Sequence, residues 1–130
     1  MIKVENLVCG YTPGKPIIGP LSFEIAQGDI ACLIGPNGIG KSTLFKTILG
    51  LLKPLSGAIA VKNRDYRAYT AKEFARMVAY VPQGHVPPFP YTVRDVVVMG
   101  CNPNMHELSV PGPAEDDIAN EKLALMGIGH

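Results

Sequence analysis

The sequence predicts an α/β fold that includes at least part of a parallel sheet. Short apolar or alternating segments, typical of strands, take turns along the chain with segments of helical periodicity. A glycine-rich stretch, residues 35–40, joins a continuous apolar run to the first helical segment. The resulting order of strand, glycine loop, helix, turn, strand, helix and strand is typical of α/β proteins.

Three segments in the first third of the chain are predicted strands. Residues 1–7 alternate between polar and apolar side chains, and residues 17–26 do so with their apolar side chains on one face. Residues 30–34 are apolar throughout, which is typical of a strand buried on both faces of a parallel sheet. We therefore expect residues 30–34 to be a central strand that leads directly into the glycine loop.

Helix start and stop signals place the elements that follow. Residues 42–49 are a predicted helix that ends at Gly50, and residues 58–61 and 78–81 are short predicted strands. Two capping boxes, each a threonine followed three residues later by an acid, open two further helices. They are Thr70 with Glu73, before residues 71–77, and Thr92 with Asp95, before residues 93–100. An amphipathic helix over residues 114–126 is opened by acidic side chains and ended by Gly127.

Composition limits the class of protein. The 130 residues fit one small domain, and 47% apolar residues are enough for a core. A net charge of +1 excludes a broad basic surface for nucleic acid. The three cysteines and three histidines lack the spacing of metal ligands, and we interpret the cysteines as reduced thiols. With no signal peptide and no apolar run near the roughly 18 residues of a membrane span, we expect a soluble, cytoplasmic protein.

The glycine loop carries a phosphate-binding pattern. Residues 35–42, GPNGIGKS, fit G-x-x-x-x-G-K-[ST]. Glycines let successive backbone N–H groups turn toward a phosphate, and the following helix adds its positive end. Lys41 would supply a full charge to the β- and γ-phosphates, and the Ser42 hydroxyl would be a ligand of Mg²⁺. The pattern therefore predicts a nucleoside triphosphate site.

The loop and its flanks resemble one family. Residues 35–44, GPNGIGKSTL, resemble the Walker A segment of ABC-type ATPases, and residues 21–35 and 51–61 resemble the family's segments on either side. The resemblance covers nearly the whole chain. It implies a partial P-loop NTPase fold with N-terminal antiparallel strands, the P-loop core and the start of a helical subdomain. It also implies ATP and Mg²⁺ as cofactors. The residues it implies for nucleotide binding are Tyr11, Gly35, Asn37, Gly38, Gly40, Lys41, Ser42 and Thr43.

Two single residues take their roles from this resemblance. Tyr11 matches the family's adenine-stacking aromatic, although by spacing alone a turn tyrosine with a solvated hydroxyl is favoured. Gln83 ends VAYVPQ and matches the family's Q-loop glutamine, although by itself it reads as a solvated loop amide. The resemblance implies that Gln83 contacts Mg²⁺ or the attacking water and senses the membrane subunit. It thus implies Lys41 and Gln83 as catalytic residues, and Ser42 and Gln83 as metal ligands.

The segment after Gln83 points to a subgroup of the family. Residues 91–103, YTVRDVVVMGCNP, resemble a stretch of importer ATPases for iron-siderophores, haem and cobalamin. Cys101 departs from that stretch, where arginine is usual. The apolar VVVM is also typical of a buried helix face. The resemblance implies an ATP-binding subunit that energises the uptake of a metal chelate.

Several elements that the family needs for hydrolysis are not found in this sequence. Residues 99–130 contain no SGG and no apolar strand ending in a paired acid, and Asp116 with Asp117 reads as a helix-capping pair. We therefore expect a chain without the signature, Walker B and switch histidine, covering about the first half of the family's domain. Whether this chain alone is an ATPase stays open. The alternatives are an ATP-binding remnant without hydrolysis and a soluble ABC protein with no role in transport.

The resemblance also implies an organisation, partners and a location. Residues 1–130 would form a truncated ABC ATPase domain, with part of the nucleotide-binding core in residues 1–90 and the start of the helical subdomain in residues 91–130. The implied partners are membrane-spanning permease subunits, a second ATP-binding subunit that shares ATP across a dimer, and indirectly an external binding protein. Nucleic acid is not among them. The expected location is cytoplasmic, peripheral on the inner face of the cell membrane.

Overall fold

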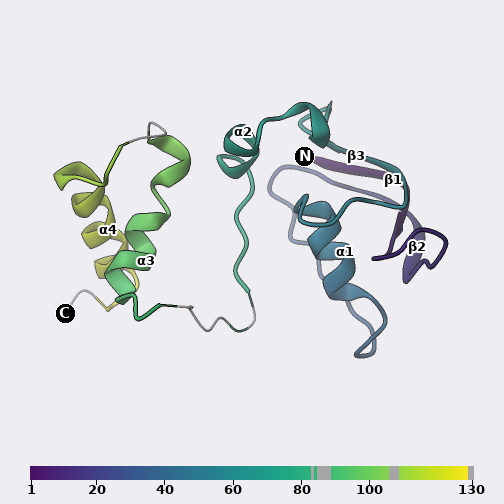
Figure 1. The fold of residues 1–130 in the computed structure, drawn as a ribbon, viewed down its shortest axis with the longest axis horizontal. Helices are drawn as coiled ribbons and strands as arrows, with labels where there is room; N and C mark the ends of the chain where they lie inside the picture. The colour runs from purple at the N-terminus through teal and green to yellow at the C-terminus, as the bar shows by residue number, and fades with distance from the viewer. Residues whose placement is uncertain (83, 85–88, 106–108, 129–130) are drawn as a thin grey trace. The chain divides into compact units, whose positions relative to one another are not determined.

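The computed structural model describes residues 1–82, 84, 89–105 and 109–128. The chain divides into two compact units, Met1–Phe74 and Ala75–His130 (Figure 1). Each unit is described by itself. Among the described residues, none of the helices is both long and apolar enough to cross a membrane.

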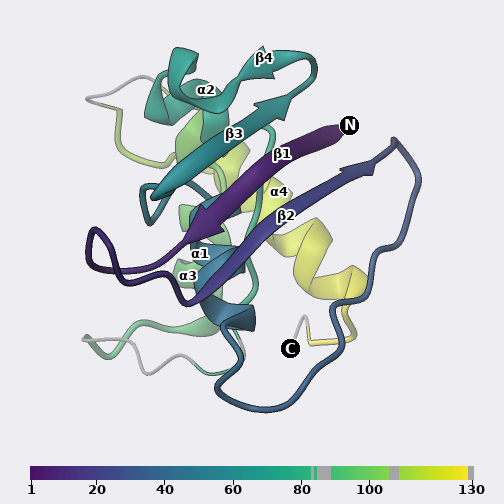
Figure 2. The same ribbon diagram turned by 90° about the vertical axis from the view of Figure 1, so that its right-hand side faces the viewer.

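The first unit is built on a four-stranded sheet in which every pairing is antiparallel. Its strands are β1 (Ile2–Cys9), β2 (Ile18–Ile25), β3 (Ser56–Val61) and β4 (Arg64–Asp65), in the order β2-β1-β3-β4. β1 lies between β2 and β3, as Figure 2 shows. The strands expected near residues 1–7, 17–26 and 58–61 are thus confirmed. The two-residue β4 was not predicted.

One helix, α1 (Lys41–Ile48), covers a face of this sheet (Figure 2). The core between them is formed by buried side chains of β1, β3 and α1: Val4, Leu7, Cys9, Ile59 and Leu44. Full burial of a large aliphatic side chain contributes about 1.5–3 kcal/mol, so this small cluster is the main source of stability in the unit. The predicted helix over residues 42–49 is confirmed, and Gly50, with φ of 73°, follows its end as expected.

The predicted central strand over residues 30–34 is wrong. This segment has no strand geometry, and the side chains of Ile30 and Ile34 are 99% and 88% exposed. Among the described residues no strand pairs with it, so its backbone N–H and C=O groups have no ladder to join. Residues 78–81 likewise form no strand, with Val81 90% exposed. The expected parallel part of the sheet is therefore absent from the described residues.

In the part of the chain that the structure describes, three helices and two short 3-10 turns follow the sheet. The turns are η1 (Tyr66–Ala68) and η2 (Asn102–Asn104), and the helices are α2 (Ala71–Ala75), α3 (Val93–Met99) and α4 (Pro113–Leu125). Both predicted capping boxes are confirmed. The Thr70 N–H donates to Glu73 Oε2 at 2.7 Å, and the Thr92 N–H donates to Asp95 Oδ2 at 2.8 Å, with the return bonds also present. α2 is shorter than predicted.

Within the second unit, α3 packs against α4. An ion pair of 2.9 Å joins Arg94 on α3 to Asp116 on α4. Arg76 Nε donates to the Pro103 carbonyl at 2.7 Å and so ties the start of this unit to η2. The predicted helix over residues 114–126 is confirmed as α4, and Gly127, with φ of 72°, follows it.

Candidate functional site

The glycine loop of residues 35–40 ends at the N-terminus of α1. Gly38 and Gly40 have φ of 82° and 105°, in the left-handed region where a side chain would be strained. Gly40 is the N-cap of α1, and none of the described side chains caps the helix there. The first backbone N–H groups of α1 therefore keep their capacity to bind an anion, and the helix dipole adds to it.

The side chain of Lys41 folds over this loop. Its Nζ donates to the carbonyl oxygens of Gly35 at 2.6 Å and of Pro36 at 2.7 Å. Both acceptors are neutral and belong to the loop itself. The ammonium group thus lies over the same turn as the free N–H groups of α1, which concentrates positive charge at one place.

Gly40 also links the loop to the segment that carries Tyr11. A Cβ atom at position 40 would lie 2.9 Å from Cγ2 of Ile17 and 3.1 Å from Cβ of Ile18. Only glycine allows the end of the loop to approach the start of β2 so closely. Tyr11 lies in the turn between β1 and β2, which is closed by a Thr12–Lys15 bridge and by the Ile17 N–H bonding to the Cys9 carbonyl at 2.8 Å.

Tyr11 is 58% exposed, and a charged side chain lies beside its ring. The Lys46 ammonium, on the last turn of α1, lies 5.9 Å from the ring centroid, within the range of a cation–π contact. The sequence reasoning missed Lys46. No local signal predicts this contact, because the two residues are 35 positions apart and meet only when α1 packs on the sheet.

The structure brings most of the predicted site residues to one end of α1. Gly35, Asn37, Gly38 and Ser42 are exposed, and Thr43 is buried, at 5% exposure. The Thr43 carbonyl accepts a bond of 2.8 Å from the Thr47 hydroxyl, so the first turns of the helix are fixed by a buried contact. Gln83 lies outside the described residues.

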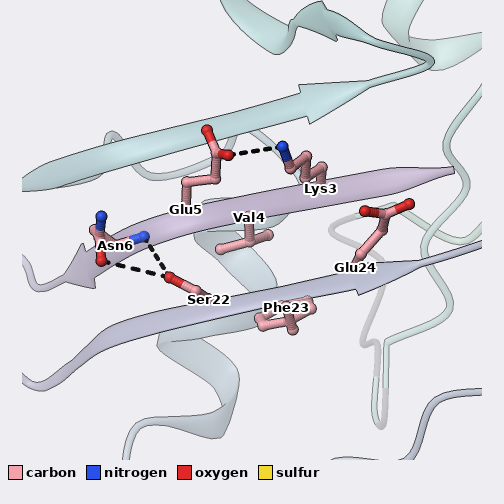
Figure 3. A pocket seen from close by; sticks show the side chains of 7 residues that line it. All are labelled: Lys3, Val4, Glu5, Asn6, Ser22, Phe23 and Glu24. Carbon is pink, nitrogen blue, oxygen red and sulfur yellow. Dashed lines mark hydrogen bonds and ion pairs between the residues drawn. The ribbon is translucent and has the colours of Figure 1, made fainter.

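A hollow lies on the sheet, between β1 and β2 (Figure 3). Its lining residues are Lys3, Val4, Glu5, Asn6, Ser22, Phe23 and Glu24. Lys3 Nζ pairs with Glu5 Oε1 at 2.7 Å, and this hydrogen bond raises the pKa of the Lys3 ammonium. Because two carboxylates face one ammonium, this hollow is a poor site for a phosphate. The glycine loop is the better anion site.

Comparisons with known proteins agree with this geometry. The family model described as "ABC transporter" matches residues 18–130. An uncharacterized ABC transporter ATP-binding protein of Haemophilus influenzae is 37% identical over 130 residues, which are 100% of this chain and 49% of that protein. The zinc transport system ATP-binding protein TroB of Treponema pallidum is 40% identical over 130 residues, covering 98% of this chain and 47% of TroB.

The fold is also found among solved structures. A structure described as an inward-facing conformation of a metal-chelate type ABC transporter superposes with a TM-score of 0.76 at 31% identity. The match covers 99% of this chain and 45% of that one. The chain spans about half the length of the curated relatives it matches. It belongs to the ABC transporter family and represents the N-terminal portion of the family's ATP-binding domain.

Proposed function

We propose that the chain binds the triphosphate of ATP at the glycine loop. The observation that carries this proposal is the Lys41 ammonium, held 2.6 Å and 2.7 Å from two loop carbonyls beside the uncapped N-terminus of α1. A charged donor and several free N–H groups that converge on one turn form an anion site. The tight approach of Gly40 to Ile17 supports a site for a whole nucleotide, because Ile17 ends the turn that carries Tyr11.

Each predicted residue has a proposed task, and for the residues that the structure describes the position is compatible with that task. The backbone of Gly35, Asn37, Gly38 and Gly40 binds phosphate oxygens, Lys41 neutralises the β- and γ-phosphates, and Thr43 fixes the start of the helix that donates to them. Tyr11 stacks on the base, and its exposure leaves ring surface for that contact. Gln83 keeps its proposed role near the metal and the attacking water, and Lys41 with Gln83 remain the proposed catalytic pair.

Mg²⁺ would depend on the nucleotide as much as on the protein. The exposed Ser42 hydroxyl is a suitable hard oxygen ligand, and Gln83 is the other proposed one. Among the described residues, no group of three or more His, Cys, Asp or Glu side chains is arranged to hold a metal. A magnesium ion in such a site takes most of its ligands from phosphate oxygens and water, and when bound it neutralises phosphate charge.

For the intact protein we propose uptake of a transition metal or a metal chelate, such as iron-siderophore, haem or cobalamin. The support is the zinc system of TroB and the metal-chelate type transporter among the similar structures. The proposed partners are membrane-spanning permease subunits, an external binding protein and a second ATP-binding subunit. The proposed location is the inner face of the cell membrane, and the proposed division assigns residues 1–90 to the nucleotide-binding core and residues 91–130 to the helical subdomain.

The first test is ATP binding by the purified chain, measured by titration calorimetry. Lys41→Ala should weaken ATP binding by at least about tenfold, because a charge-assisted hydrogen bond contributes about 1.5–3 kcal/mol. Lys53→Ala is the matched control, since Lys53 is an exposed lysine that lies outside the loop. Equal ATP affinity of wild type and Lys41→Ala would contradict the proposed site.

The same preparation separates the two enzymatic alternatives. Sustained phosphate release that disappears in Lys41→Ala would identify this chain as an ATPase by itself. Binding without release would identify an ATP-binding module that does not hydrolyse alone. Uptake assays with radioactive zinc, a ferric siderophore and haem, in cells that lack the coding sequence, would test the cargo class. Unchanged uptake of all three would count against a role in metal import.

A further inference from the structure

The contact between Tyr11 and Lys46 has no assigned role in nucleotide binding. Lys46 lies on α1, and its ammonium is 5.9 Å from the centroid of the Tyr11 ring. Both residues belong to the first compact unit. The contact joins the helix that carries Lys41 to the turn proposed to receive the base.

The described residues offer the Lys46 side chain few other contacts. In the part of the chain that the structure describes, no carboxylate pairs with its ammonium, and its backbone carbonyl accepts from the N–H groups of Leu51 and Leu52. The ring of Tyr11 is therefore the contact that sets the direction of this charge. Among the described residues, no other contact of α1 requires a cation at this exposed position.

The geometry of the helix separates Lys46 from the phosphate end. Lys46 follows Lys41 by five residues, which rotates it by about 140° around the helix axis and moves it about 7.5 Å along it. Its side chain thus leaves α1 on a different side from that of Lys41. The position of the Lys46 ammonium is therefore not explained by a direct contact with the triphosphate.

We propose that Lys46 is a positioning residue for the base: it holds one face of the Tyr11 ring and leaves the other face to stack on a purine. This inference rests on the proposed function, in which Tyr11 receives the base of ATP. An aromatic ring has two faces, and a cation on one of them restrains the ring without covering the other. A ring already held in place loses less freedom when a base stacks on it.

The experiment compares a nucleotide with a ligand that has phosphates and no base. Dissociation constants for ATP and for inorganic tripolyphosphate are measured on wild type, Lys46→Met and Lys46→Arg, with Lys53→Met as the matched control. Lys46→Met should weaken ATP binding about twofold to fivefold, the size of an exposed cation–π contact, and leave tripolyphosphate binding unchanged. Lys46→Arg should restore the ATP affinity, and Lys53→Met should change neither.

A double-variant cycle tests the route through Tyr11. In a Tyr11→Leu background, Lys46→Met should have no further effect on ATP binding. An equal loss for ATP and tripolyphosphate would overturn the inference, because Lys46 would then act as a general attractive charge. A loss for ATP that persists in Tyr11→Leu would also overturn it. Circular dichroism of each variant excludes unfolding as the cause.

Failure of the proposed function would look different. If wild type bound neither ligand, or if Lys41→Ala left both affinities unchanged, the triphosphate site would be wrong and this inference would fall with it. If wild type bound both ligands equally well and depended on Lys41, the phosphate site would stand. Only the stacking role of Tyr11, and with it the role of Lys46, would then be refuted.

Discussion

Strand β1 and residues 30–34 are two apolar segments of the same unit, and only β1 forms a buried strand. β1 pairs with β2 on one side and β3 on the other, and its side chains Val4 and Leu7 are at most 1% exposed. Residues 30–34 are apolar at every position, yet Ile30 and Ile34 are almost fully exposed. The segment with the stronger apolar pattern is the one that forms no strand.

This difference separates two requirements for a strand. Apolar side chains favour burial, but the backbone must also place its N–H and C=O groups in hydrogen bonds. β1 meets both requirements because β2 pairs with it on one side and β3 pairs with it on the other. Among the described residues, nothing offers residues 30–34 a neighbouring ladder. An apolar run therefore indicates that a segment favours burial. Whether the segment forms a strand depends on a neighbouring strand that can accept its backbone hydrogen bonds.

Hydrogen exchange should show the largest contrast between the two segments. Amides of β1 and β3 should exchange more slowly than those of residues 31–34, by a factor on the order of a thousand, because they open only with the sheet. Mass spectrometry of peptic fragments resolves the two regions. Comparable protection of residues 31–34 would mean that the segment has a hydrogen-bonding partner in solution.

Core truncation should give the next largest effect. Ile59, on β3, is 1% exposed, and Ile59→Ala should lower the free energy of unfolding by about 2–5 kcal/mol. The matched change Ile34→Ala, at an 88% exposed position, should cost less than about 0.5 kcal/mol. Urea denaturation measures both. Similar losses at the two positions would refute the contrast drawn from burial.

In the second unit, the start of α3 depends on a local capping signal and needs no distant partner. Thr92→Ala removes the N-cap and should destabilise α3 by about 1 kcal/mol. Far-ultraviolet circular dichroism during thermal unfolding would detect the loss. Thr92→Ser, which keeps the hydroxyl, should remain close to wild type. If Thr92→Ser lowered the stability as much as Thr92→Ala, the stabilisation of α3 would not come from the hydroxyl.

The smallest effect should be a pH dependence of the same cap. Hydrogen bonds from Thr92, first from its side chain and then from its backbone, lower the pKa of the Asp95 carboxyl below its ordinary value of 3.8. Because the folded-state pKa is depressed, this stabilisation is present above the ordinary value and is lost as the pH falls through the folded-state value. Wild type should therefore lose slightly more stability than Asp95→Asn between roughly pH 5 and pH 2.

The sequence predicted the features that short stretches determine. Both capping boxes and the glycines after α1 and α4 follow from bonds within a few residues, and the structure confirms them. The phosphate-binding pattern can also be recognised in the sequence, because its glycines and Lys41 lie close together in the chain. The antiparallel order of the sheet and the failure of residues 30–34 depend on distant partners. The contact of Lys46 with Tyr11 also depends on them, and no local pattern encodes it.

The two bonds from Lys41 to the carbonyls of its own loop have a consequence for the entropy of binding. A free lysine side chain loses up to about 1.5–2 kcal/mol of rotamer freedom when it is fixed. In this chain the folded loop already restricts that side chain through Gly35 and Pro36. An arriving triphosphate therefore exchanges two neutral acceptors for charged ones with little further ordering of the lysine. We expect Lys41 to contribute to affinity mainly through enthalpy.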